Sequence, residues 1–289
     1  MCDDFTTIED DAKLSAMGVS RRDFAGLAAS AGLAALTASP AYAAVDVVEM
    51  AVTIPTGDGQ CDAFLYHPVT GKHPGIVMWP DIAGLRDAYK LTARRLAGEG
   101  YAVLVVNHYY RTAHAPLLNS IVEWRTPAGA EKLKPAIAAL NPERITKDAV
   151  AFAAFLDKQA VVDRKRGLGG AGYCMTGGYP TRMAAAVPAR VKACASLHGA
   201  GLVDDRPDGV IALIPQTKAS FLFAIGRNDD ARAPGDKDAL NKAAAAAGRP
   251  AEVEVYNADH GWTTLDSPGY DKAEAERVWA RIVALFAHL

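Results

Sequence analysis

Short apolar stretches alternate with helical patterns from residue 45 to the carboxyl terminus, and this alternation limits the possible folds more than any other feature. Apolar stretches at residues 75–79, 103–106 and 167–173 have the length of buried strands, and helical patterns at residues 89–98 and 145–159 separate them. Strands that alternate with helices build a mostly parallel sheet with helices on both faces. The sequence therefore predicts an α/β fold in one domain, residues 44–289.

The remaining predicted elements continue this order. Strands are expected at residues 47–54, 63–66, 193–197, 220–225 and 252–256, the first two as an antiparallel pair, and helices at residues 175–186, 237–247 and 273–289. Residues 109–141 interrupt the pattern with Pro116, Pro127 and Pro135. This insertion is either a lid or substrate-facing loop over the carboxyl ends of the strands, or a solvated excursion.

Cys174 stands at a predicted junction of strand and helix, where residues 172–178 have the sequence GYCMTGG. A nucleophile elbow places one reactive side chain on a tight turn of this kind, and its flanking positions must be small, as Gly172 and Gly177 are. A helix beginning near Met175 would direct backbone N–H groups at the site, lower the pKa of the thiol and stabilise an oxyanion. The alternative is a buried thiol that only packs.

An acid and a histidine follow later predicted strands. Asp229 lies four residues beyond the apolar stretch 223–225, and His260 follows the last strand. Open parallel sheets place active sites at the carboxyl ends of their strands, and nucleophile, acid, histidine is the chain order of α/β-hydrolases. Asp230 is an alternative acid if the turn is one residue longer. His108 and His198 also follow strands but precede the acid, so we expect them to line the pocket.

These segments together resemble the dienelactone hydrolase family, which are cysteine-dependent α/β-hydrolases. The resemblance rests on Gly172-Tyr173-Cys174, on the turn formed by residues 79–85, on Tyr109-Tyr110-Arg111, and on Asp229 and His260. It extends from residue 45 to the carboxyl terminus and implies the α/β-hydrolase fold with a triad of Cys174, His260 and Asp229. It implies no cofactor and no metal.

The resemblance also implies roles for residues around the triad. The backbone N–H groups of Ile82 and Met175 would form an oxyanion hole. Asp81 replaces a glutamate that hydrogen-bonds the resting thiol in the family, although it can also cap the local turn. Arg111 would bind a substrate carboxylate or cover apolar surface with its stem. With Asp81 and Arg111 we group Tyr173 and Trp262 as substrate-binding or thiol-orienting residues.

Two positions depart from the family pattern. Thr176 stands where the motif usually has glycine, which predicts crowding in the elbow. Thr264 stands four residues after His260, where dienelactone enzymes carry a second substrate-binding arginine. A dienelactone with a free carboxylate is therefore not the substrate that these residues favour.

The amino-terminal residues have the pattern of an export signal. Ser20-Arg21-Arg22-Asp23-Phe24 precedes an apolar stretch at residues 25–37 and an Ala41-Tyr42-Ala43 cleavage motif, which resembles a twin-arginine signal. The apolar stretch is shorter than the roughly 20 residues of a membrane-spanning helix, so a retained anchor fits less well, and it lacks the polar face of an amphipathic helix. We predict a signal peptide over residues 1–43, transient contact with the twin-arginine export machinery, and a periplasmic or secreted enzyme with no membrane contact after cleavage.

Charge and cysteine content exclude several partners. The 289-residue chain has a formal net charge of -2, with no excess of positive charge for nucleic acid or anionic lipid. Signal cleavage leaves Cys61, Cys174 and Cys194, and we expect Cys174 to remain a thiol. The absence of a CxxC pair argues against a structural zinc site and a redox thiol protein.

The sequence thus predicts a hydrolase that cleaves a small-molecule ester or lactone through a Cys174 thioester. A thiolate is intrinsically nucleophilic, so activated esters and strained lactones fit better than unactivated esters. Two alternatives remain: a general carboxylesterase or thioesterase on the same scaffold, and a catalytically silent protein that binds a small molecule.

Overall fold

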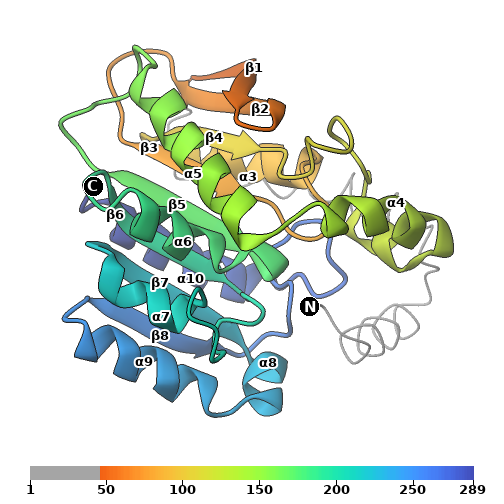
Figure 1. The fold of residues 1–289 in the computed structure, drawn as a ribbon, viewed down its shortest axis with the longest axis vertical. Coiled ribbons are helices and arrows are strands. Elements are labelled where there is room, and N and C mark those ends of the chain that lie inside the picture. Colours follow the sequence, from red (N-terminus) through yellow and green to blue (C-terminus); the bar gives the residue numbers. More distant parts are fainter. Residues whose placement is uncertain (1–45) are drawn as a thin grey trace.

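A sheet of eight strands runs through the whole of the computed structural model, which describes residues 46–289 (Figure 1). Its strand order is β1-β2-β4-β3-β5-β6-β7-β8. Strand β1 (Val47–Thr56) pairs antiparallel with β2 (Gly59–Pro68), β2 pairs antiparallel with β4 (Ala102–Val106), and all later pairings are parallel. The prediction of a mostly parallel sheet in an α/β fold is confirmed.

The other elements follow the predicted order. The strands are β3 (Gly75–Trp79), β5 (Leu168–Tyr173), β6 (Val191–Leu197), β7 (Ser220–Gly226) and β8 (Ala251–Tyr256). The helices are α3 (Asp87–Gly98), α4 (Pro127–Ala138), α5 (Pro142–Asp157), α6 (Tyr179–Ala186), α7 (Val210–Leu213), α8 (Arg227–Arg232), α9 (Asp236–Ala246) and α10 (Lys272–Phe286). Among the described residues there are also three short 3-10 helices: η1 (Ile121–Arg125), η2 (Cys174–Thr176) and η3 (Ile214–Gln216).

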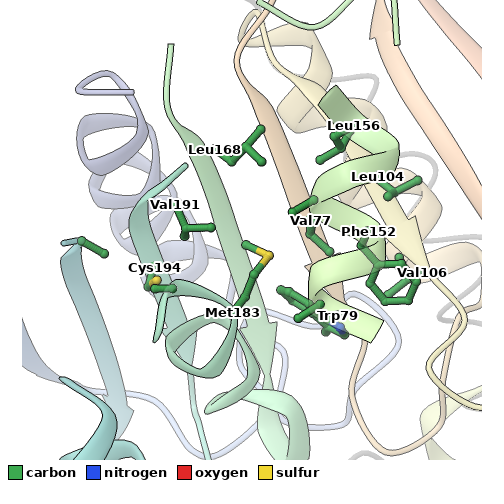
Figure 2. Close-up of a cluster of buried hydrophobic side chains, with 14 of the residues drawn as sticks. Val77, Trp79, Leu104, Val106, Phe152, Leu156, Leu168, Met183, Val191 and Cys194 are labelled. Carbon is green, nitrogen blue, oxygen red and sulfur yellow. The ribbon is translucent and has the colours of Figure 1, made fainter. Parts of the chain in front are cut away.

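Each face of the sheet has its own apolar core. Successive side chains of a strand point to opposite faces, so Val77 and Trp79 of β3 face α5 and α6, whereas Ile76 and Met78 face α3 and α10. Figure 2 shows the first core, in which Phe152 of α5 and Met183 of α6 pack beside Trp79. Because β3 and β4 are buried on both faces, their sequences are continuous apolar runs and not alternating ones.

Two helix starts differ from the predicted bounds because a side chain caps the helix. Helix α5 begins at Pro142, three residues before the predicted start, because the Asn141 side chain accepts a hydrogen bond of 2.9 Å from the Arg144 amide and caps the helix. The Asp271 side chain caps α10 in the same way, by accepting a bond of 3.1 Å from the Glu274 amide. The residues in these first turns are polar, so apolar periodicity does not report them.

Residues 109–141 are more ordered than the sequence predicts. They contain η1 and α4, and the Thr126 side chain between the two helices accepts a 3.0 Å hydrogen bond from the Gly129 amide. Pro127 occupies the first turn of α4, where its missing N–H costs nothing. Helices α7 and α8 were likewise not predicted, because each has six residues or fewer.

Strand β8 forms one edge of the sheet and is bordered by charge. Arg281 of α10 donates a 2.8 Å hydrogen bond to Glu252, and Arg277 donates one of 2.9 Å to Glu254. Both glutamates belong to β8 and alternate with Val253 and Val255, which pack against the first core. One face of the edge strand is therefore apolar and the other is charged.

The predicted export signal, with its boundary after residue 43, lies outside the described residues. Within residues 46–289, no helix combines the length and the apolar character that crossing a membrane requires.

Candidate active site

Register brings the sequence-predicted site residues to one edge of the sheet. Trp79 at the end of β3 is paired with Gly172 in β5, so the turn after β3 lies beside Cys174. Tyr173 is paired with Leu197, which places His198 next to Cys174 on the other side. The carboxyl ends of six parallel strands thus lie at one edge of the sheet, where open α/β sheets place their sites.

Cys174 occupies a turn that a side-chain-bearing residue rarely adopts. Its φ is 54°, in the left-handed region, and the residue is 3% exposed. This conformation costs energy for a non-glycine residue, so it persists only where the surrounding structure imposes it. Such residues cluster at active sites. No disulfide joins the three described cysteines, Cys61, Cys174 and Cys194. Burial raises the pKa of the Cys61 and Cys194 thiols far above its ordinary value, so both stay protonated.

Close packing explains the glycines that flank Cys174. A Cβ atom on Gly172 would lie 2.3 Å from the Thr176 carbonyl oxygen, and one on Gly177 would lie 2.4 Å from the Gly199 Cα. Neither contact is compatible with a side chain. The prediction that these two positions must be small is confirmed.

Thr176 fits the elbow without crowding it, contrary to the prediction. The side chain is completely buried, and its hydroxyl donates to the Trp79 carbonyl oxygen at 2.9 Å and accepts from the Tyr173 amide at 3.0 Å. These bonds join the ends of β3 and β5. The departure from glycine therefore adds a cross-strand connection beneath Cys174.

The predicted helix start at Met175 is wrong. Cys174, Met175 and Thr176 form the 3-10 turn η2, and α6 begins only at Tyr179. Gly177 and Gly178 separate the two helices, and Pro180 favours the first turn of α6. The N–H groups nearest the thiol therefore belong to η2.

Asp229 and His260 meet as predicted. The Nδ1 atom of His260 lies 2.9 Å from Oδ2 and 3.1 Å from Oδ1 of Asp229, which stands in the first turn of α8. Burial raises the pKa of the Asp229 carboxyl, but the charge and hydrogen bond of His260, with Arg232 behind them, outweigh burial and lower it. Asp229 is therefore an anion beneath the imidazole.

Asp230 points elsewhere. Its carboxylate oxygens accept hydrogen bonds from the Lys237 ammonium at 2.8 and 3.0 Å. The sequence left the choice between the two aspartates open. In the structure, Asp229 contacts His260 and Asp230 does not.

Cys174 and His260 line one small pocket. The cavity volume is only about 20 Å³. Its ten lining residues come from five segments: Asp81, Ile121, Trp124, Arg125, Cys174, His198, His260, Gly261, Thr264 and Ser267. Segment 109–141 contributes three of them, so part of this insertion faces the site and is not a solvated excursion.

His198 packs directly on His260. The two ring centroids are 4.9 Å apart, and Nε2 of His198 lies 2.9 Å from the Thr263 hydroxyl. Burial, and then the neighbouring His260, hold the pKa of His198 well below its ordinary value. The predicted pocket-lining role is confirmed for His198. The same prediction is wrong for His108, which lies outside the pocket and packs against Tyr109. Burial lowers the pKa of His108 to about 3.

Ile82 and Met175 both contact the hydroxyl of Tyr109. The Tyr109 hydroxyl donates a 2.8 Å hydrogen bond to the Ile82 carbonyl oxygen and lies 3.9 Å from the Met175 sulfur. Met175 also packs against the small apolar cluster that contains Ile82 and Tyr109. The structure thus brings together the two residues that the resemblance named for an oxyanion hole.

Asp81 forms part of a buried ion triad that the sequence did not predict. Its two oxygens accept hydrogen bonds from Arg86 at 2.7 and 2.9 Å, and Asp266 accepts two more from the same guanidinium, both of 2.8 Å. Asp81 also accepts a 2.9 Å bond from the Ala83 amide, which supports its turn-capping alternative. Burial opposes the charge of Arg86, but Asp266 and Asp81 raise its pKa well above the ordinary value.

Three other predicted residues do not reach the pocket. The Arg111 side chain is 8% exposed and binds Asp148 at 2.7 and 2.8 Å and Asp58 at 2.9 Å. The Tyr173 ring lies 5.0 Å from Tyr89 in the second core. Trp262 is fully buried. None of the three lines the pocket, and the partners of Arg111 and Tyr173 lie far away in sequence, where a local motif cannot indicate them.

Comparison with known protein families assigns the chain to one of them, because the model of the dienelactone hydrolase family matches residues 61–289. The chain belongs to the dienelactone hydrolase family. It is a hydrolase. In the described part of the chain, no three His, Cys, Asp or Glu side chains cluster as ligands of a metal ion would.

Named relatives agree with this family. The chain is 28% identical over 172 residues to "Probable 2-oxo-3-(5-oxofuran-2-ylidene)propanoate lactonase" of Bradyrhizobium sp, a match that covers 58% of this chain and 64% of the lactonase. It is 28% identical over 227 residues to the carboxymethylenebutenolidase of Rhodococcus opacus, covering 75% and 82% of the two chains. A crystal structure titled "Putative Dienelactone Hydrolase", from Klebsiella pneumoniae subsp. pneumoniae MGH 78578, superposes with a TM-score of 0.72 at 22% identity, covering 84% of this chain and all of the other.

Replacing Arg86 by methionine tests the importance of the triad. Arg86→Met leaves Asp81 and Asp266 buried without their counter-charge, and we expect the free energy of unfolding to fall by about 3–5 kcal/mol. Urea unfolding followed by circular dichroism measures the change. Arg164→Met removes an exposed arginine and should change stability by less than about 0.5 kcal/mol. Equal stability of the two variants would contradict a supporting role for the triad.

Proposed function

We propose that this chain hydrolyses an ester or lactone bond through a thioester formed on Cys174. The observation that carries the proposal is that His260, hydrogen-bonded to Asp229 at 2.9 Å, lines the same pocket as Cys174. A nucleophile, a base and an orienting acid at the carboxyl ends of successive strands are the components of acyl transfer. The names of the relatives, a lactonase and a carboxymethylenebutenolidase, favour a lactone as substrate.

In the first half of the reaction, His260 accepts the Cys174 proton and the sulfur attacks the carbonyl carbon. The resulting oxyanion accepts hydrogen bonds from the N–H groups of Ile82 and Met175. The bond between the carbonyl carbon and the ester oxygen then breaks, and His260 returns the proton to the departing oxygen. In a lactone that oxygen stays attached to the acyl group, so the ring opens.

In the second half, His260 takes a proton from water, and the hydroxide formed attacks the thioester carbon. The carbon–sulfur bond breaks, His260 returns its proton to the departing sulfur, a carboxylic acid leaves, and the thiol of Cys174 is restored. Asp229 stabilises the imidazolium and keeps the Nδ1 proton on its own side, so that Nε2 faces the reacting atoms. The neutral His198, whose ring meets that of His260 edge to face, adds no competing positive charge.

Cys174→Ala tests the nucleophile. We expect kcat/KM for an activated aryl ester to fall by about a thousandfold or more, because the covalent route is lost. Cys194→Ala is the matched control, since Cys194 is buried one strand away and its thiol donates to the Pro180 carbonyl at 3.2 Å. Activity of Cys174→Ala equal to wild type would remove the thiol mechanism. No activity in any form, wild type included, would favour a silent binding protein.

Asp229→Asn and Asp230→Asn separate the two neighbouring acids. Asn at position 229 cannot stabilise the imidazolium, so we expect kcat to fall by about a hundredfold or more. Asp230→Asn weakens only the contact with Lys237 and should leave kcat within about threefold of wild type. Steady-state kinetics on one aryl ester measures both. A larger loss at position 230 would reverse the assignment.

We further propose that the protein is exported folded through the twin-arginine pathway. The support is the Ser20–Phe24 motif with Arg21-Arg22, followed by the apolar residues 25–37 and the Ala41-Tyr42-Ala43 site. Expression in a bacterial host should yield periplasmic protein that begins at Ala44. Arg21→Lys with Arg22→Lys should keep it in the cytoplasm, as fractionation and amino-terminal sequencing would show. Export of the double variant at the wild-type level would contradict the proposal.

A further inference from the structure

His198 has a backbone conformation that only one other non-glycine residue between residues 46 and 289 shares. Its φ is 40°, and the second such residue is Cys174, with a φ of 54°. The left-handed region costs energy for a residue with a side chain, and such strain persists only where the surrounding structure imposes it. One of the two positions carries the proposed nucleophile. Lining the pocket does not by itself require this conformation at the other.

Hydrogen bonds on three sides hold His198 and the residues after it. The His198 amide donates to the Ala224 carbonyl oxygen of β7 at 2.8 Å. Two residues further on, the Ala200 amide donates to the Cys174 carbonyl oxygen at 3.0 Å. On the side chain, Nε2 lies 2.9 Å from the hydroxyl of Thr263, in the loop after β8. His198 is thus tied to the neighbouring strand, to the turn of the nucleophile and to the loop that follows the last strand.

The ring of His198 is fixed against that of His260. The two centroids are 4.9 Å apart and the ring planes are inclined by 62°, so the rings meet edge to face. The His198 ring also meets Trp262 edge to face, at 5.3 Å and 65°, and the residue is 1% exposed. Edge-to-face contacts between rings have a preferred geometry, so these two contacts restrict the orientation of every ring in the group.

Contacts with α8 fix His260 at two points. Its Nδ1 atom lies 2.9 Å from Asp229, and its amide donates a 2.8 Å hydrogen bond to the Asn228 side chain. A ring held through Nδ1 can still tilt about that contact, and the tilt moves Nε2, the atom that must accept the Cys174 proton. A displacement of about 1 Å at a reacting group can lower the rate about a hundredfold. Packing against His198 restricts this tilt.

We propose that His198 is a positioning residue for the catalytic base: anchored by Thr263, its ring sets the tilt of the His260 imidazole and directs Nε2 at the Cys174 sulfur. This inference rests on the proposed function of the site. In this role His198 exchanges no proton and forms no bond with the substrate. Because burial and the neighbouring His260 keep the pKa of His198 well below its ordinary value, the contact brings no repulsion when the imidazolium forms.

Two substitutions at position 198 separate the ring from the rest of the side chain. His198→Phe keeps a ring against His260 but loses the bond to Thr263, whereas His198→Asn loses the ring and tolerates the left-handed backbone. On 4-nitrophenyl acetate we expect kcat to fall about 30-fold or more for His198→Asn and less than about tenfold for His198→Phe, with KM within about threefold of wild type in both. Circular dichroism checks that each variant folds.

Thr263→Val tests the anchor from the other side. We expect kcat to fall about three- to tenfold, and the double variant with His198→Phe to be no slower than His198→Phe alone, because the bond is already absent there. His108→Phe is the matched control and should keep kcat within about threefold. His108 is also buried and follows β4, but it lies outside the pocket, and neither of its ring nitrogens has a hydrogen-bond partner among the described residues. Multiplied losses in the double variant, or equal kcat for His198→Asn and His198→Phe, would overturn the proposal.

Alkylation of Cys174 distinguishes failure of this inference from failure of the proposed function. Iodoacetamide reacts with the thiolate, so its rate at pH 7 reports how well His260 accepts the thiol proton, whether or not an ester is hydrolysed. Mass spectrometry of the peptide that carries Cys174 should give a rate about tenfold lower in His198→Asn than in wild type or in the His108→Phe control. If His198→Asn does not fold, Thr263→Val decides in its place, with an expected reduction of about threefold.

The outcomes separate as follows. Slower alkylation in the variant, without ester hydrolysis by wild type, would leave the positioning role of His198 standing and remove the proposed reaction. Equal alkylation rates in wild type and in the folded variant would overturn the inference, whatever the activity.

Discussion

A single buried guanidinium organises the rim of this site. Arg86 is 1% exposed, and it holds Asp81 in the turn after β3 and Asp266 in the loop after β8. Asp266 in turn accepts the amide of Ile121, so η1 is tied to the same group. Segments that are 180 residues apart in sequence thereby share one electrostatic centre. Removing one partner of a buried ion pair lowers the free energy of unfolding strongly, so the positions of these segments depend on one another.

Around this centre, the register of the sheet positions the three side chains of the proposed triad. Pairing of Trp79 with Gly172 and of Gly226 with Tyr256 aligns the strand ends from which Cys174, Asp229 and His260 project. Steric exclusion at Gly172 and the hydroxyl of Thr176 then fix the turn that carries the thiol. The positions of the proposed catalytic groups depend on backbone geometry, whereas those of Asp81 and Asp266 at the rim depend on side-chain pairing with Arg86.

This division explains what the sequence could predict. Cys174, Asp229 and His260 were placed correctly at strand ends, because strand position follows from apolar runs that any reader of the sequence can locate. Arg111 could not be judged, since its partner Asp148 lies on α5, and the direction of a long flexible side chain depends on which acid comes near. For the same reason, neither the Asp81–Arg86–Asp266 triad nor the pocket position of Arg125 left a signal in spacing or periodicity.

The charged border of β8 has a consequence for the behaviour of the protein in concentrated solution. An edge strand offers unpaired backbone groups to which a strand of another molecule can add. Here Glu252 and Glu254, neutralised one by one by Arg281 and Arg277, cover one face of that strand with ionic groups. An apolar strand that added to this edge would have to bury or break the ion pairs of Glu252 and Glu254. The pairs therefore disfavour edge-to-edge aggregation at a strand that also carries two valines.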